Sequence, residues 1–322
     1  MIRFLFAMLF LGGICLAEDS RLVMQTDPDK GVTTIAIDGK TVVVYRHGED
    51  VDLPHFYPWN SPSGRNMVID KTEPFPHHRA FWVAEDRVLL EGETRRFSNY
   101  YALGTGVMKP EVSRWQVAPY HDRSKHIAFE NIKTTKTTLE FDEKILWLAG
   151  ETKIADELRH YKFTALENGE YFLDFSFKVV ATYGKLSIIS DLTHYAWPYI
   201  RMNETFNVDV GKGVITNSEG QVGQGATDQR PAVWVDYSAP TPDGKWEGLA
   251  CFLHPSETEP ITWLTRAYGC WGPNRKASQH NTTFEVPKGE ALMRRIGLLI
   301  HNGNVNTGNV AERYRAYCNG EL

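Results

Sequence analysis

Two adjacent histidines and an arginine form the stretch of this sequence that is best suited to proton transfer. His77, His78 and Arg79 follow two closely spaced prolines and precede Trp82. An imidazole acts as a general acid, a general base or a metal ligand, and a guanidinium holds an oxyanion or sugar hydroxyls. Neighbouring residues of a strand point to opposite faces, so we expect one histidine to act and the other to support it. The alternative is a polar edge strand whose histidines bond backbone carbonyls.

A second stretch combines aromatic rings with polar groups. It carries Arg266, Tyr268, Trp271 and Asn274 within nine residues. Ring faces cover the apolar C–H patch of a pyranose, while guanidinium and amide groups bond its hydroxyls. These four residues, together with Trp82, therefore predict a saccharide-binding surface; the alternative is packing in the core.

Two weaker groups extend this candidate site. Arg230 precedes an apolar run, and Asp191 and His194 share one short segment with Arg201. For the second of these groups, the alternative is a set of polar surface residues on an edge strand. A carboxylate partner for the imidazoles is also expected, and the sequence offers three equivalent candidates: Asp191, Asp228 and Glu290.

The sequence lacks the common cofactor and hydrolase motifs. It contains no HExxH, GxSxG or GxxxxGK[ST] motif and no Rossmann glycine fingerprint, so we predict no organic cofactor. A divalent metal stays open, because 11 histidines and many carboxylates could assemble a site from distant strands.

The elements that position these side chains are mostly strands. Residues 137–142 and 171–177 alternate between apolar and polar or small residues, and turn residues such as Asp38-Gly39 separate such segments. No strand–helix alternation is evident, and only Val305 to Tyr317 shows helical spacing. The pattern predicts an all-β fold, a large antiparallel β-sandwich with a short C-terminal helix.

The N-terminus has the features of a secretory signal. A basic residue precedes an apolar run from Phe4 to Cys15, and small residues follow. We predict that residues 1–17 are a signal peptide and that residues 18–322 form one domain, exported to the periplasm or the extracellular space. Lipid attachment at Cys15 is disfavoured by the bulky Ile14 before it.

Charge and hydropathy exclude several partners. The net charge of −5 gives no electrostatic footprint for nucleic acid. No stretch of the mature chain is long and apolar enough to cross a membrane, so we expect no integral membrane association. Apart from Cys15 there are three cysteines, which allow at most one disulfide: Cys251, Cys270 and Cys318.

Six ordered segments resemble the PmoA-like family, a bacterial group of unknown function often labelled "methane oxygenase". The matching segments are Tyr57-Pro58 with Ser61 to Gly64, Pro76 to Arg79 with Phe81-Trp82, Ala232 to Ser238, Leu253 to Ser256, Tyr268 to Asn274, and Leu298 to Gly303. Pro74-Phe75 departs from the Asp-His pair that members carry, which puts a shared metal or proton chemistry in doubt. The oxygenase label conflicts with the lack of membrane-spanning segments.

This resemblance implies a galactose-mutarotase-like supersandwich, a fold of sugar epimerases, glycosidase domains and polysaccharide lyases. Our first hypothesis is a secreted carbohydrate-active enzyme that transfers protons through His77 or His78 in hydrolysis, β-elimination or epimerisation. The rivals are a non-catalytic glycan-binding protein of the cell envelope and a structural envelope protein.

Overall fold

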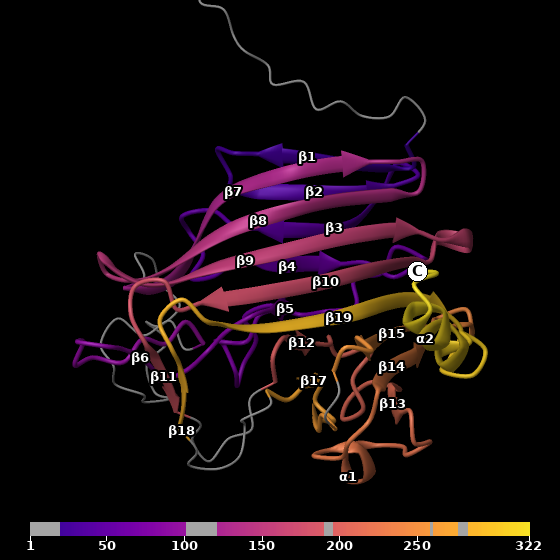
Figure 1. The fold of residues 1–322 in the computed structure, drawn as a ribbon. Helices are drawn as coiled ribbons and strands as arrows, with labels where there is room; N and C mark the ends of the chain where they lie inside the picture. The colour runs from indigo at the N-terminus through magenta and orange to yellow at the C-terminus, as the bar shows by residue number, and fades with distance from the viewer. Residues whose placement is uncertain (1–19, 101–120, 190–195, 258–259, 276–282) are drawn as a thin grey trace, which may run out of the picture.

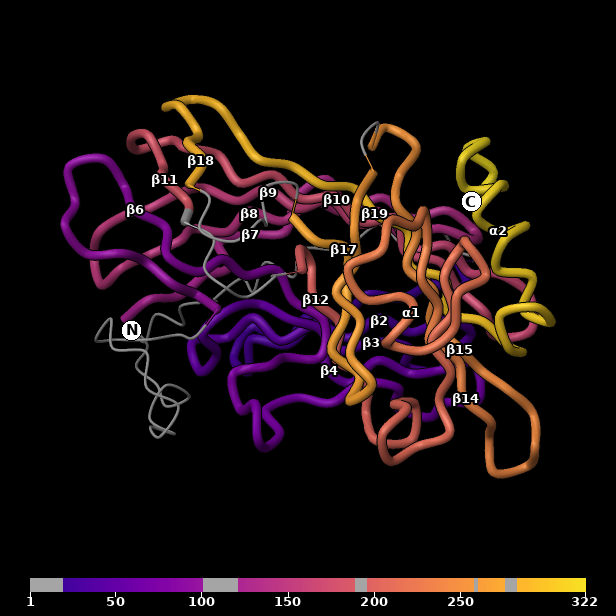
Figure 2. Tube along the Cα trace, turned by 90° about the horizontal axis from the view of Figure 1, so that it is seen from below, coloured from indigo at the N-terminus to yellow at the C-terminus, as the bar shows by residue number. Residues whose placement is uncertain are grey.

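The computed structural model describes residues 20–100, 121–189, 196–257, 260–275 and 283–322. Its strands form two eight-stranded sheets and one three-stranded sheet. Figure 1 shows the two large sheets lying over one another, and Figure 2 shows them as separate layers. The predicted all-β class, an antiparallel sandwich with a short C-terminal helix, is confirmed.

The first sheet has the strand order β1-β2-β3-β4-β5-β12-β17-β16. Its strands are β1 (Leu22–Asp27), β2 (Val32–Ile37), β3 (Lys40–Arg46), β4 (His55–Trp59), β5 (Phe81–Trp82), β12 (Tyr199–Arg201), β16 (Trp263–Thr265) and β17 (Cys270–Pro273). The order brings the segment around Trp82 next to strands that lie far along the chain.

The second sheet has the order β13-β14-β15-β19-β10-β9-β8-β7. Its strands are β7 (Asp122–Thr134), β8 (Thr138–Ala149), β9 (Thr152–Ala165), β10 (Tyr171–Val180), β13 (Val214–Asn217), β14 (Trp234–Pro240), β15 (Trp246–Leu253) and β19 (Ala291–Asn302). The third sheet, β18-β11-β6, joins β6 (Val88–Leu90), β11 (Leu186–Ile189) and β18 (Thr283–Val286). A four-residue helix, α1 (Gln224–Thr227), precedes β14.

Local sequence explains the strands and their turns. In β2, Thr33, Ile35 and Ile37 are buried and the residues between them are not, as the half-buried face of a sheet requires. Asp38 and Gly39, with φ of 50° and 75°, make the tight turn into β3, because glycine adopts this left-handed conformation without a steric penalty. This hairpin confirms the turn expected at these residues.

The main core lies between the two large sheets. Phe56 of β4 contacts Tyr161 of β9 with ring centroids 5.8 Å apart, and Phe81 of β5 lies 5.4 Å from Phe175 of β10. Such edge-to-face contacts stabilise aromatic pairs beyond the burial of their area. The inner faces of both sheets therefore pack as one interior.

A buried polar network also lies between the sheets. Glu143 of β8 is fully buried and accepts hydrogen bonds from the hydroxyls of Tyr45, at 2.6 Å, and Tyr161, at 2.8 Å. Arg159 donates to Glu157 at 2.6 Å and to the Tyr45 hydroxyl at 3.0 Å. The paired and bonded charges avoid the large cost of burying an isolated ion.

The C-terminal helix α2 (Val310–Cys318) begins later than the sequence predicted. The side-chain oxygen of Asn304 accepts hydrogen bonds from the backbone N–H groups of Asn306 and Thr307, both at 3.0 Å. These bonds hold a turn where helical spacing alone predicted the first helical turn, since asparagine competes for backbone partners in this way.

α2 covers a second, smaller core on the outer side of the second sheet. Tyr317 of the helix packs against Phe172 of β10 with ring centroids 5.1 Å apart, and Phe252 of β15 lies in the same cluster. Both faces of β10 are therefore buried at this point.

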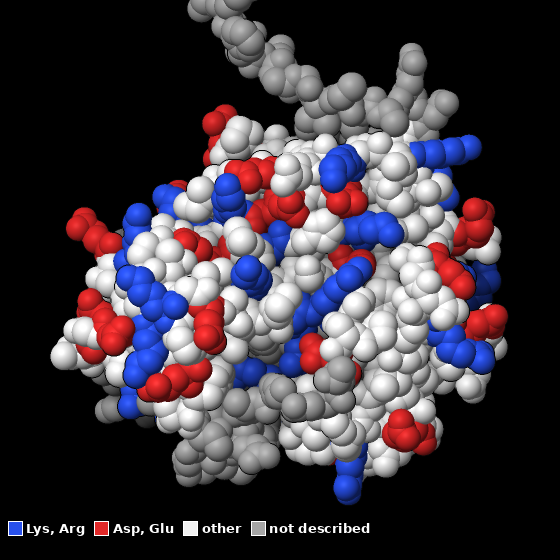
Figure 3. Space-filling model, in the orientation of Figure 1, with Lys and Arg blue, Asp and Glu red and all other residues white. Residues whose placement is uncertain are grey.

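The described cysteines are all free thiols: Cys251 and Cys270 are buried, and Cys318 is exposed. No helix among the described residues is long and apolar enough to span a membrane. Figure 3 shows acidic and basic side chains interspersed over the face seen in Figure 1.

Candidate functional site

The histidine pair lies in a tight turn and not on a strand. The backbone N–H of His78 donates to the carbonyl of Phe75 at 2.9 Å, and the N–H of Lys71 donates to the carbonyl of His78 at 3.0 Å. The rings of His77 and His78 contact edge to face, 4.5 Å apart. The expectation that they point to opposite faces of a strand is therefore wrong, because a turn places consecutive side chains on the same side.

Phe75 organises the cluster around His78. Its ring stacks on the imidazole of His78, with centroids 4.9 Å apart and planes at 15°. It also stacks on Tyr268, again at 4.9 Å. The guanidinium of Arg201 lies over the Tyr268 ring at 4.4 Å, a cation–π contact. Phe75 thus joins His77, His78 and the predicted Tyr268 in one cluster. In the sequence, Phe75 is notable only because it departs from the family pattern.

The outer face of the first sheet supports this cluster. Trp82 of β5 is paired in register with Tyr199 of β12, and their rings stack 4.8 Å apart. The His78 ring lies 5.6 Å from Trp82. Because side chains alternate along a strand, Arg201 shares this face with Tyr199. Two short strands therefore place an indole, a phenol and a guanidinium beside the histidine turn.

Both imidazoles of the turn are uncharged at neutral pH. Burial, reinforced by the charge of Arg79, lowers the pKa of His77 to about 4. Burial, with His77 and Arg201 nearby, lowers the pKa of His78 well below its ordinary value. A neutral imidazole accepts a proton or binds a metal, but it has no proton to give as an imidazolium.

The two ring nitrogens of His78 differ in their contacts. Nε2 lies 3.2 Å from the hydroxyl of Tyr100, whereas the buried Nδ1 makes no hydrogen bond to the residues that the structure describes. Burial raises the pKa of Tyr268, so that phenol keeps its proton and serves as a donor. Tyr100 and Tyr268 thus offer hydroxyl groups beside a proton acceptor.

Arg79 is a structural residue of the site. Its side chain is 0% exposed and forms a bidentate ion pair with Asp52, with Nε–Oδ1 at 3.1 Å and Nη2–Oδ2 at 2.5 Å. Its Nη1 donates to the carbonyl of Pro76 at 3.2 Å. The prediction that Arg79 holds an oxyanion or hydroxyls is not met, because Asp52 and the turn occupy this guanidinium.

Other predicted binding residues serve the fold. Trp271 of β17 is paired with Ile200, which places it on the inner face, where its ring stacks on Tyr237 at 4.6 Å. It is fully buried, so no face of this ring is available to a sugar, which corrects the prediction. The side-chain nitrogen of Asn274 donates to Gln229 and to Thr262, both at 2.9 Å, and so its donors are used within the protein.

The expected carboxylate partner is not found among the candidates that the structure describes. Asp228 pairs with Arg266 at 2.5 Å, so each of these predicted residues is engaged by the other. Glu290 is exposed in the turn before β19. Asp191 and His194 lie outside the described residues. Within the described ranges, no group of three or more histidine, cysteine, aspartate or glutamate side chains is arranged to hold a metal ion.

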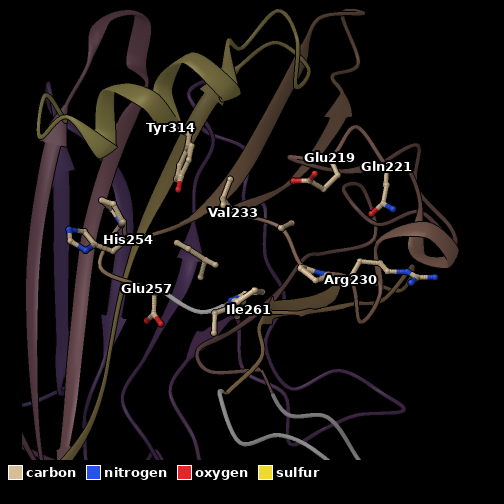
Figure 4. A pocket seen from close by; sticks show the side chains of 13 residues that line it. Glu219, Gln221, Arg230, Val233, His254, Glu257, Ile261 and Tyr314 are labelled. Carbon is tan, nitrogen blue, oxygen red and sulfur yellow. The ribbon is translucent and has the colours of Figure 1, made fainter.

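Arg230 belongs to a different region, an open groove of about 820 Å³ below α2. Figure 4 shows Tyr314 reaching from α2 toward Val233, with His254 and Glu257 on one side and Arg230 on the other. Val233 is 41% exposed, so the groove has an apolar floor with charged groups at its edges. The candidate residues of the sequence therefore divide between the histidine cluster, this groove and the core.

Comparison with known proteins gives a family match and remote structural similarities. The chain matches, over residues 32–315, the family described as "Family of unknown function (DUF6807)". None of the curated proteins matches it.

Three solved structures indicate the range of these similarities. A polysaccharide lyase has 12% identity and a TM-score of 0.37 over 89% of this chain and 33% of its own. A GalM/aldose epimerase homologue from C. elegans has 8% identity and a TM-score of 0.34 over 88% of this chain and 99% of its own. The GH36 alpha-galactosidase AgaB from Geobacillus stearothermophilus has 10% identity and a TM-score of 0.37 over 89% of this chain and 42% of its own. The chain thus spans less than half of the lyase and of the galactosidase, and similarities this remote carry no information on activity.

Proposed function

The chain belongs to DUF6807, a family of unknown function, and we therefore infer its activity from its own side chains. We propose that it is a saccharide-processing enzyme that transfers protons through His77 and His78. The protein would act outside the cytoplasm after removal of residues 1–17. Membership of the PmoA-like group and a galactose-mutarotase-like arrangement of the sandwich are part of the same proposal.

The observation that carries this proposal is the convergence of two uncharged imidazoles with phenol rings on one face of a sheet. His77 is partly exposed, His78 is 3% exposed, and Tyr268 is partly exposed beside them. Hydrolysis, β-elimination and epimerisation all require a group that takes a proton and a group that delivers one. A neutral imidazole supplies the first and a protonated phenol supplies the second.

The structure also suggests how the two histidines divide this work. His77 lies toward solvent, where it meets a ligand first, and burial keeps it in the proton-accepting form down to about pH 4. His78 lies behind it, in contact with Tyr100 through Nε2. We infer that His77 exchanges protons with the substrate and that His78 holds the ring and the phenol in place.

Substituting each histidine tests this proposal. We expect His77→Gln to lower the turnover of a saccharide processed by the wild-type protein by about 100-fold or more, the usual contribution of a general base. His78→Gln should lower it less. Chromatography of products from a panel of oligosaccharides provides the measurement, and His160→Gln on β9 is the control. Unchanged turnover in His77→Gln would refute the assigned role.

The groove below α2 favours a second candidate function, non-catalytic saccharide binding. Its exposed Val233 and the ring of Tyr314 offer apolar surface, and Arg230 and Glu257 offer partners for hydroxyls. If saccharides raise the melting temperature of the wild-type protein without turnover, and Tyr314→Ala abolishes that rise, this second function is favoured. If no saccharide raises it at millimolar concentration, both functions fail.

A further inference from the structure

Arg201 differs from every other buried arginine that the structure describes. Four of them lie within 4.0 Å of a carboxylate, in the pairs Arg79–Asp52, Arg159–Glu157, Arg275–Glu85 and Arg294–Glu257. Arg201 is 6% exposed and has no carboxylate at this distance among the described residues. It is therefore a buried cation that forms no ion pair within the described residues.

The contacts that Arg201 does make leave one edge of its guanidinium unused. Nη1 donates to the carbonyl oxygen of Tyr268, and the cation lies 4.4 Å above the ring of the same residue. Nε is buried without a hydrogen-bond partner, and no hydrogen bond from Nη2 is formed within the described residues. The Nε–Nη2 edge is the one that binds the two oxygens of a carboxylate side by side.

The backbone holds this guanidinium firmly in place. Arg201 ends β12, and the N–H of the next residue, Met202, donates to the carbonyl of Gly269 at 2.8 Å. Gly269 has φ of +96°, and a Cβ there would lie 2.9 Å from the Met202 carbonyl oxygen. This close approach, which requires glycine, fixes the turn that presents Tyr268 to Arg201.

The described groups around Arg201 compensate its charge only in part. Burial lowers the pKa of Arg201, and the negative charge of Asp209 opposes this shift without forming an ion pair with the guanidinium. His78 is neutral, and the indole N–H of Trp82 on the same face is a further buried donor that makes no hydrogen bond within the described part of the chain. Burying a cation without an ion-pair partner is costly, and an anionic ligand would reduce that cost.

We propose that Arg201 is the binding residue for the carboxylate of an acidic saccharide, so that the substrate class of this site is a uronic acid or a uronate-containing glycan. The assignment rests on the proposed saccharide-processing function and specifies its substrate. The carboxylate binds along the Nε–Nη2 edge, and the sugar ring extends toward Tyr268 and the histidine turn.

Matched pairs of sugars that differ only at C6 test this assignment. The melting temperature of the full chain is measured with galacturonate and galactose, glucuronate and glucose, and mannuronate and mannose, and affinities are measured by calorimetry. At least one uronate should bind about tenfold or more tightly than its neutral partner, the contribution of one charged hydrogen-bonded contact.

Variants of Arg201 identify the residue responsible. Arg201→Gln should remove the preference for the uronate, and Arg201→Lys, which keeps the charge but not the planar fork, should weaken it. Arg46→Gln is the control, because Arg46 also bonds a carbonyl, that of Tyr57, and lies over that residue's ring at 5.5 Å. Because Arg201 forms no ion pair within the described residues, Arg201→Gln should leave the melting temperature of the ligand-free protein unchanged or higher.

The outcomes separate this inference from the function on which it rests. Equal binding of uronate and neutral sugar, or a preference that survives in Arg201→Gln, overturns the role of Arg201 and leaves the saccharide function standing. Equal stabilisation by galactose 6-sulfate overturns the assignment to a carboxylate. If none of these sugars stabilises the protein, the saccharide function fails as well. Unfolding of both Arg201 variants would show a structural role and overturn the inference.

Discussion

Arg79 and Arg201 use a buried guanidinium in opposite ways. Arg79 forms a close pair with Asp52 and bonds the turn that carries the histidines, whereas Arg201 has no carboxylate partner among the described residues. A buried ion pair stabilises the fold, because removing one partner leaves the other charge uncompensated. A buried arginine that forms no ion pair is a reason to expect an anionic ligand.

Substituting Arg79 should therefore destabilise the protein. We expect Arg79→Gln to lower the free energy of unfolding by about 3–5 kcal/mol, since Asp52 would remain buried without its cation. Urea denaturation measures this loss. Arg46→Gln, a control of similar size in a partly buried position, should lose less than about 1 kcal/mol. A loss for Arg79→Gln no larger than the control would show that the pair does not hold the turn.

The histidine turn should also make stability depend on pH. The pKa of His77 is about 4 in the folded protein, because of its burial and the charge of Arg79, and near 6.5 when unfolded. The unfolded chain thus binds more protons between these values, so stability is full above about pH 6.5 and falls as the pH decreases toward 4. Urea denaturation at several pH values should show a shallower fall in His77→Gln. A parallel fall in the two proteins would contradict this reasoning.

The composition of the site was only partly predictable at the residue scale. The sequence brought His77, His78 and Tyr268 into one hypothesis, and the structure places these three in one cluster. Trp271 could not be assigned, because only the strand register determines which face it occupies. The sequence marked Arg201 only as part of a weak group, because whether an arginine forms an ion pair depends on its three-dimensional neighbours.

At the scale of elements, local patterns predicted strands better than they predicted turns around the site. The alternation over residues 137–142 and 171–177 corresponds to β8 and β10, and the Asp38-Gly39 turn is present. The stretch that carries His77 and His78 was expected to be a strand, but the two prolines before them lack the N–H groups that a strand ladder requires. It forms turns, and these turns bring the two imidazoles together.

The C-terminal helix should contribute strongly to stability through one side chain. Tyr317 is 4% exposed and packs on Phe172 and Phe252, with ring centroids 5.1 and 6.1 Å apart. Tyr317→Ala should lower the free energy of unfolding by about 3–5 kcal/mol, because it leaves a cavity in this core. Thermal or urea denaturation measures the loss, and exposed Arg315→Ala should change little. A small effect of Tyr317→Ala would mean that α2 does not close this core.

For the whole molecule, the sequence predicted the class and not the sheet order. Periodicity and turn residues favoured an antiparallel sandwich, and the two facing sheets confirm it. The order of strands depends on pairings between distant segments, such as β5 with β12, which no local pattern specifies. The site depends on those same pairings, and so its full composition could be derived only from the structure.

The position of β19 has a consequence for how this protein is made. This strand, residues 291–302, lies in the middle of the second sheet, paired with β10 on one side and β15 on the other. Until a ribosome has synthesised these residues, β10 and β15 have no neighbour on those edges and the two halves of the sheet stay apart. The second sheet is thus completed only once residues 291–302 have been made, although its other seven strands come earlier in the chain.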